Sequence, residues 1–166
     1  PHMGLYFTAE EVLTIAERIE ENGVIFYRRA AERATAEDVR KLLLRLAQDE
    51  EGHRRAFAQM RAGLTSGEKP AFTLSPEDDA AGYLHALADL VLFPRDANPS
   101  DILGATPTRR DVLLTAIQKE KDSVAYYAGM RQIVPKAFGK MKVDAILREE
   151  MRHVAELARQ IEQVGA

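Results

Sequence analysis

Cysteine is absent from this sequence of 166 residues. Without cysteine the chain can form no disulfide, no thiolate metal site and no iron–sulfur cluster, so any redox chemistry needs another kind of centre. Histidine is also scarce, with four residues, and His2 lies in an opening Pro1-His2-Met3 that resembles a remnant of an expression tag. Three histidines are therefore left to carry chemistry.

Strong charge of one sign and long apolar runs are lacking as well. The formal net charge is -3, and acidic and basic residues are interleaved, which argues against a nucleic-acid surface or a basic membrane-binding helix. No apolar run could span a bilayer, and the N-terminus shows no signal-peptide pattern. We therefore expect a cytoplasmic protein without nucleic-acid or membrane partners, folded as one domain over residues 4–166.

Helical periodicity dominates the sequence. Apolar residues recur at steps of three and four, which predicts long helices over about residues 8–34, 35–62, 108–135 and 140–164. Thr8, Thr35 and Thr108 are each followed three residues later by an acidic residue, so we predict them as N-caps. A shorter helix ending near Phe93 is predicted in the long connection. Since no segment alternates like a strand, we predict an all-α, ferritin-like four-helix bundle of two antiparallel helix pairs joined by a long crossover.

The two helix pairs repeat each other at an offset of 100 residues. The identical pairs are Thr8/Thr108, Val12/Val112, Leu13/Leu113, Ala16/Ala116, Glu20/Glu120, Val24/Val124, Tyr27/Tyr127, Glu50/Glu150, His53/His153 and Ala58/Ala158. Duplication for packing alone would repeat apolar residues and caps. The repetition of Glu and His therefore indicates a shared chemical role.

Six of the repeated polar residues are predicted to point into the core: Glu20, Glu50, His53, Glu120, Glu150 and His153. Each Glu-x-x-His places its two side chains on one helix face, and the other two glutamates align with apolar faces. We expect no Lys or Arg at matching inward positions. Four buried carboxylates would then need protons or metal ions to offset the cost of their burial.

Two divalent ions would balance four carboxylates, and two neutral imidazoles would fill further coordination positions. Oxygen and nitrogen ligands suit iron or manganese better than calcium. One Glu from each of two helices, with Glu-x-x-His from each of the other two, is the ligand set of carboxylate-bridged di-iron bundles. The alternative is a bundle whose buried Glu–His pairs are satisfied without metal.

Four segments carry a family resemblance: IEENGVIFYRRAAE (19–32), DEEGHRRAF (49–57), KEKDSVAYY (119–127) and EEMRHVAEL (149–157). In this order they resemble the motifs of the rubrerythrin branch of the ferritin-like superfamily. The resemblance implies terminal metal ligands at Glu20 and Glu120, bridging ligands at Glu50 and Glu150, and nitrogen ligands at His53 and His153. It also implies that Tyr27 and Tyr127 lie beside the centre and take part in catalysis, and the alternative is that they are simple core residues.

By that resemblance, two iron ions would react with hydrogen peroxide or dioxygen in a non-haem peroxidase or ferroxidase, supplied by an external electron donor. A homodimer is expected on the same ground. The chain departs from the family in lacking the cysteines of a rubredoxin module and in having Ser123 where a further carboxylate is usual. An iron-binding or iron-sequestering protein is therefore the alternative function, and a manganese protein or a small-molecule oxidase is a third.

Small residues at repeat-related positions allow two interpretations. Gly23 and Ser123 could permit close helix packing, or they could leave an open face for dioxygen or peroxide. The acidic neighbours are expected to face solvent, with an entry path for ions as the alternative for one of them: Glu21, Asp49, Glu51, Asp122 and Glu149.

Overall fold

A computed structural model describes residues 9–66, 79–91, 108–134 and 139–164. The helices are α1 (Ala9–Arg33), α2 (Glu37–Ala62), α3 (Asp79–Val91), α5 (Arg109–Ile133) and α6 (Lys140–Val164). These ranges contain no strand, and no helix within them is both long and apolar enough to cross a membrane. The long helices begin and end within two residues of the predicted bounds, so the all-α prediction is confirmed.

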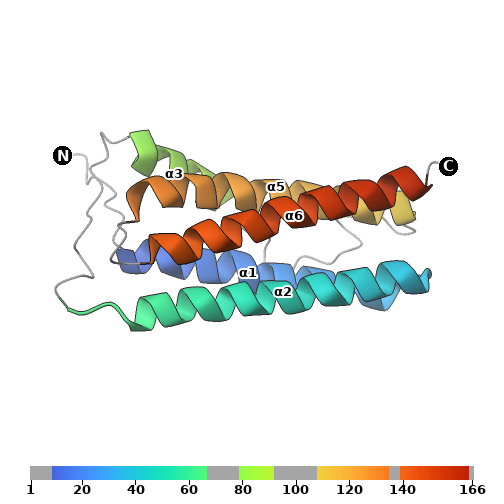
Figure 1. The fold of residues 1–166 in the computed structure, drawn as a ribbon, viewed down its shortest axis with the longest axis horizontal. Coiled ribbons are helices and arrows are strands. Elements are labelled where there is room, and N and C mark those ends of the chain that lie inside the picture. The colour runs from blue at the N-terminus through green and yellow to red at the C-terminus, as the bar shows by residue number, and fades with distance from the viewer. Residues whose placement is uncertain (1–8, 67–78, 92–107, 135–138, 165–166) are drawn as a thin grey trace.

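The helices form a bundle of two antiparallel pairs. The helix α1 packs along α2, α5 packs along α6, and α3 lies against α5. Figure 1 shows that α1 and α6 run in one direction while α2 and α5 run in the other. The end of α2 and the start of α5 therefore lie at opposite ends of the bundle, as in four-helix bundles with one long crossover.

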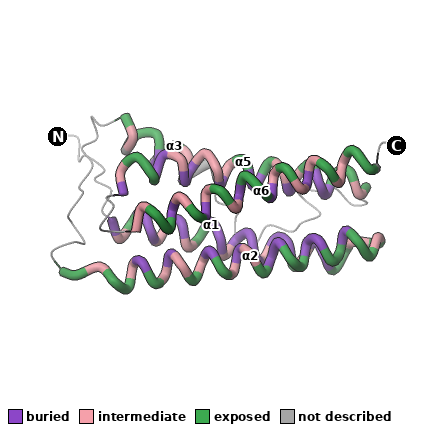
Figure 2. The backbone as a smooth tube through the Cα atoms, viewed as in Figure 1, coloured by how far each residue is buried: buried purple, intermediate pink, exposed green. Residues whose placement is uncertain are grey.

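Two apolar clusters hold the pairs together, one toward each end of the bundle. The first core cluster includes Leu13, Phe57, Tyr126, Met130 and Val143. The second core cluster includes Phe26, Leu43, Leu46, Leu113 and Leu157. Burial of each large side chain contributes about 1.5–3 kcal/mol, and the buried positions form stripes along the helices (Figure 2). Along α1, Glu20 stands between a residue of the first cluster, Ile19, and one of the second, Phe26.

The N-termini of α2 and α5 differ from each other. A capping box opens α5: Thr108 Oγ1 accepts from the Asp111 amide at 3.2 Å, and the Thr108 amide donates to Asp111 Oδ2 at 2.9 Å. The predicted cap at Thr35 is wrong, because the N-cap of α2 is Ala36, which has no capping side chain. Asp38, the expected capping partner, instead pairs with Arg109 of α5 at 2.7 Å. The predicted cap at Thr8 lies outside the described residues.

This difference predicts unequal effects of removing the two threonine side chains. Thr108→Ala deletes an N-cap hydrogen bond and should cost about 1 kcal/mol of unfolding free energy. Thr35→Ala removes a threonine with no capping role and should cost much less. Urea unfolding followed by circular dichroism measures both, and equal losses would contradict the assignment of the caps.

Candidate metal centre

The six polar side chains singled out by the repeat all lie inside the bundle. The side chains of Glu20, Glu50, Glu120 and Glu150 are 0% exposed. His53 and His153 are 5% and 2% exposed. They come from α1, α2, α5 and α6, the four long helices. The fold thus gathers side chains that lie far apart in the sequence into one buried layer.

Their ligand atoms form two overlapping groups. One group is Glu20, Glu50, His53 and Glu150, and the other is Glu50, Glu120, Glu150 and His153. Within each group the atoms lie within 4.8 Å of one another. Glu50 and Glu150 belong to both groups, whereas each histidine belongs to one. This is the geometry of two neighbouring ion positions that share two carboxylates.

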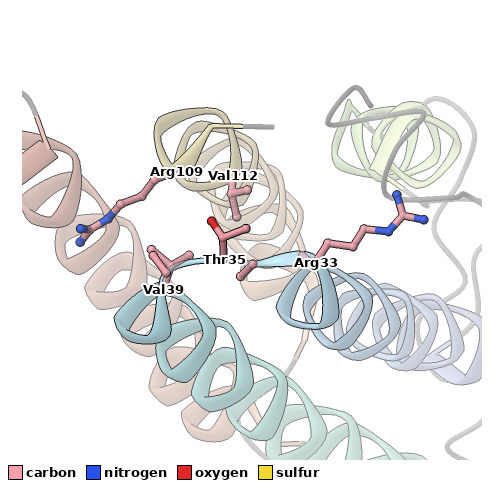
Figure 3. Close-up of a pocket in the computed structure, with 8 residues that line it drawn as sticks. Arg33, Thr35, Val39, Arg109 and Val112 are labelled. Atoms are coloured by element: carbon pink, nitrogen blue, oxygen red, sulfur yellow. The ribbon is translucent and has the colours of Figure 1, made fainter. Parts of the chain in front are cut away.

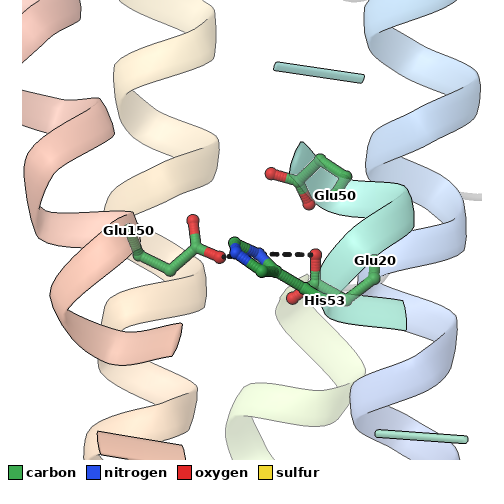
Figure 4. Close-up of side chains that lie close together, drawn as sticks. All are labelled: Glu20, Glu50, His53 and Glu150. Atoms are coloured by element: carbon green, nitrogen blue, oxygen red, sulfur yellow. Dashed lines mark ion pairs between the residues drawn. The ribbon is translucent and has the colours of Figure 1, made fainter. Parts of the chain in front are cut away.

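Each histidine turns Nδ1 toward carboxylates of other helices. Nδ1 of His53 lies 2.7 Å from Oε1 of Glu150 and 3.7 Å from Oε2 of Glu20 (Figure 4). Nδ1 of His153 lies 3.3 Å from Oε2 of Glu120, in the repeat-related position. The two rings are 6.0 Å apart between centroids. The sequence repeat therefore appears as an approximate twofold relation within the site.

The outer nitrogen of each histidine meets a carboxylate from the opposite helix pair. Nε2 of His53 lies 3.1 Å from Oε2 of Glu149, and Nε2 of His153 lies 3.2 Å from Oδ2 of Asp49. The prediction that Asp49 and Glu149 simply face solvent is therefore wrong in part: their side chains are 36% and 44% exposed, yet each contacts a histidine. Such contacts fix the orientation of an imidazole ring.

Two buried tyrosines join α1 to α5 across the site. The hydroxyl of Tyr27 donates to Glu120, and the hydroxyl of Tyr127 donates to Glu20. Burial and the charge of these carboxylates raise the pKa of both tyrosines well above the ordinary value. Both phenols therefore remain protonated and hold the carboxylates in place.

A lysine that the sequence did not lead us to expect also enters the site. Lys119 is 3% exposed, and its Nζ lies 3.2 Å from Oε2 of Glu50. The expectation of no inward Lys or Arg is therefore wrong. Lys119 follows buried Ala116 by three residues and precedes buried Ser123 by four, so the three residues share one face of α5. That spacing, and its alignment with Ile19 in the repeat, were signals that could have identified it.

Gly23 makes room for this lysine. A Cβ atom added at Gly23 would lie 2.6 Å from both Cε and Nζ of Lys119 and 2.7 Å from Oε2 of Glu50. At Gly23 the open-face interpretation is therefore wrong, because Lys119 fills the space. Its repeat partner Ser123 is buried, and Oγ has no hydrogen-bond partner within the described residues.

Protons and Lys119 neutralise this interior in the absence of metal. Burial raises the pKa of Glu150 to about 7 and also raises that of Glu50. Burial alone would lower the pKa of the histidines, but contacts with carboxylates raise the values to about 11 for His53 and about 10 for His153. Burial likewise opposes ionisation of Glu120, whose contacts with Glu150 and His153 hold its pKa at about 2.

Several buried oxygens nevertheless have no hydrogen bond in the described part of the chain. They are Oε2 of Glu20, Oε1 of Glu50 and both carboxylate oxygens of Glu150, although Oε1 and Oε2 of Glu150 lie 2.7 Å and 3.4 Å from Nδ1 of His53 and of His153 as ion pairs. Each belongs to a residue of the two overlapping groups. Carboxylate and imidazole donors match the preferences of iron and manganese, so these residues fit a pair of divalent ions. Binding such ions would have to displace protons.

A separate pocket lies about three helical turns beyond Glu20 on α1. Alanine and valine side chains form much of its lining, together with Arg33, Thr35 and Arg109. Figure 3 shows both guanidinium groups directed away from it, and Arg109 is engaged by Asp38 and Gln160. This pocket offers no cluster of metal ligands.

Comparison with known proteins agrees with this architecture. The rubrerythrin family profile matches residues 11–93, which include Glu20, Glu50 and His53. A solved structure from Thermotoga maritima, described as a ferritin-like diiron-carboxylate protein, superposes with a TM-score of 0.69 at 24% identity. The alignment covers 96% of this chain and 97% of the other, and so supports the ferritin-like fold. No curated protein sequence matches.

Because His53, His153 and Glu150 hold protons in the metal-free protein, we predict that this form loses stability as pH rises. The pKa values of both histidines are raised from 6.5, so their contribution is complete below pH 6.5 and is lost toward pH 10–11. Glu150 acts in the same direction between its ordinary 4.5 and about 7. The melting temperature of chelator-treated protein should fall by roughly 5 °C or more from pH 6 to pH 9. A constant or rising value would contradict the assigned protonation.

The carboxylates behind the histidines should support metal binding. Asp49→Asn and Glu149→Gln leave the six inner side chains intact but weaken the orientation of one imidazole each. Each should lower Mn²⁺ affinity by about 10–100-fold in calorimetric titrations.

A matched control is Glu156→Gln, which removes a partly exposed carboxylate of α6 that pairs with Arg45 at 2.7 Å. Losses no larger than that of the control would show that Asp49 and Glu149 do not support the site.

Proposed function

Because the chain belongs to the rubrerythrin family, we propose that it is a di-iron oxidoreductase that reduces hydrogen peroxide or dioxygen. The observation that carries the proposal is the pair of overlapping four-residue groups in the bundle interior. The donor set of carboxylates and imidazoles suits iron, with manganese as the alternative metal.

Glu20 and His53 would hold one iron ion, and Glu120 and His153 would hold the other. Glu50 and Glu150 would bridge the two, because each is common to both groups. When bound, a pair of ferrous ions would supply two electrons together and become ferric. The apolar clusters on both sides exclude bulk water from this layer.

Tyr27 and Tyr127 would serve the reaction through their hydroxyl groups. Each holds a proton at its hydroxyl oxygen and donates it to a terminal carboxylate, Glu120 or Glu20. They orient these carboxylates and offer protons in an interior where water is scarce. This is the role we assign to them in catalysis.

The proposed reaction needs an external reductant. Reduction of hydrogen peroxide breaks its O–O bond and consumes two electrons and two protons to give two water molecules. A one-electron donor protein or small reductant would then return two electrons to the site. Cysteine is absent from the chain, so no thiolate-bound iron of its own can fill this role.

Iron binding or sequestration with ferroxidase activity is the second candidate, in which ferrous iron is the substrate. Ser123 favours it, because a serine stands where the resemblance leads us to expect a further carboxylate. Uptake of iron well beyond two ions per chain, in a large assembly, would support this function over peroxide reduction.

Steady-state peroxide consumption tests the leading proposal. Iron-loaded protein with excess reductant should consume many equivalents of peroxide per pair of irons, and Glu50→Gln should abolish this turnover because it alters a residue common to both groups. Glu51→Gln, which changes a carboxylate paired with surface Arg54 and Arg55, should leave turnover nearly unchanged. Consumption that never exceeds one equivalent in the wild-type protein would refute the enzymatic proposal.

A further inference from the structure

Lys119 lies among the proposed metal ligands, yet an ammonium group is not itself a ligand for a metal ion. It precedes Glu120 in α5 and reaches Glu50 of α2, with Nζ and Oε2 separated by 3.2 Å. Nζ also lies 5.3 Å from the centroid of the Tyr27 ring. The charge is thus held by one carboxylate and one aromatic face in the interior.

The fold provides a specific space for this side chain. Gly23 of α1 packs so close to Lys119 that a Cβ atom there would overlap Cε and Nζ. In the other half of the repeat, the corresponding residues are buried Ile19 and Ser123. The lysine therefore lies in one half of an otherwise repeated arrangement. In that half Gly23 has no side chain and leaves space for it.

The charge balance changes when this lysine is counted. Two divalent ions alone would neutralise the four fully buried carboxylates, and Lys119 then adds one positive charge to this inner layer, because Asp49 and Glu149 lie outside it with side chains 36% and 44% exposed. The ammonium group would repel both ions, and it pairs with an oxygen of Glu50, a residue common to both groups. In a low-dielectric interior this repulsion is much stronger than in water.

We propose that Lys119 is a protein-supplied cation of the metal centre, which competes with divalent ions for Glu50 and lowers their affinity for the site. The inference rests on the proposed ligand set. Because Lys119 lowers the affinity, bound metal dissociates more readily. A lysine that merely oriented Glu50 for the metals would have the opposite effect, because its removal would weaken metal binding.

Titration of chelator-treated protein with Mn²⁺ alone distinguishes these roles. Lys119→Met keeps an unbranched side chain of similar length in the space beside Gly23 but removes the charge. Lys119→Gln also removes the charge while keeping a group able to donate a hydrogen bond to Glu50. Both variants should bind Mn²⁺ about tenfold or more tightly than the wild-type protein. The matched control Lys121→Met removes an exposed lysine of the same helix and should change the affinity by less than about twofold.

Affinity that is unchanged or lower in both charge-free variants would overturn the inference. Higher affinity in Lys119→Met but wild-type affinity in Lys119→Gln would also overturn it, because the hydrogen bond rather than the charge would then decide. Circular dichroism verifies folding, and the glutamine variant decides the matter if the methionine variant does not fold. A wild-type protein that binds no Mn²⁺ and no Fe²⁺ would refute the proposed metal centre itself, and the inference with it.

Discussion

The burial of four carboxylates in one layer of the bundle governs the rest of the site. Burying an ionised carboxylate without a partner costs several kcal/mol. Each of the four must therefore be protonated or lie beside a positive charge. In the metal-free protein it comes from Lys119 and from protons on the histidines and on Glu50 and Glu150. The apolar clusters at both ends stabilise the bundle and thereby hold the carboxylates together.

Duplication explains how so few residues build this layer. Each half supplies one Glu, one Glu-x-x-His and one tyrosine, and the important contacts cross between halves, as when Tyr27 of α1 meets Glu120 of α5. Neither half could therefore complete either ion group alone. The departure from symmetry at Lys119 gives the centre a charge that the repeat by itself would not supply.

Much of this arrangement could be predicted from the sequence, because a 3.6-residue period identifies inward faces and the repeat identifies which polar residues share them. Lys119 departs from the expectation of no inward Lys or Arg, and its spacing from Ala116 is the pattern that places it on the inward face. The contacts of Asp49 and Glu149 could not be predicted, since they depend on how the two helix pairs pack. Four expectations stay predictions: residence in the cytoplasm, a single domain over residues 4–166, a homodimer, and iron rather than manganese as the metal.

The central claim is that six side chains from four helices hold two metal ions in one site. Crystals of the protein grown with manganese, measured at a wavelength where manganese scatters anomalously, would test it most directly. The account predicts two anomalous peaks inside the bundle, one beside His53 and one beside His153, with Glu50 and Glu150 contacting both. A single peak, or peaks confined to the surface carboxylates, would contradict it.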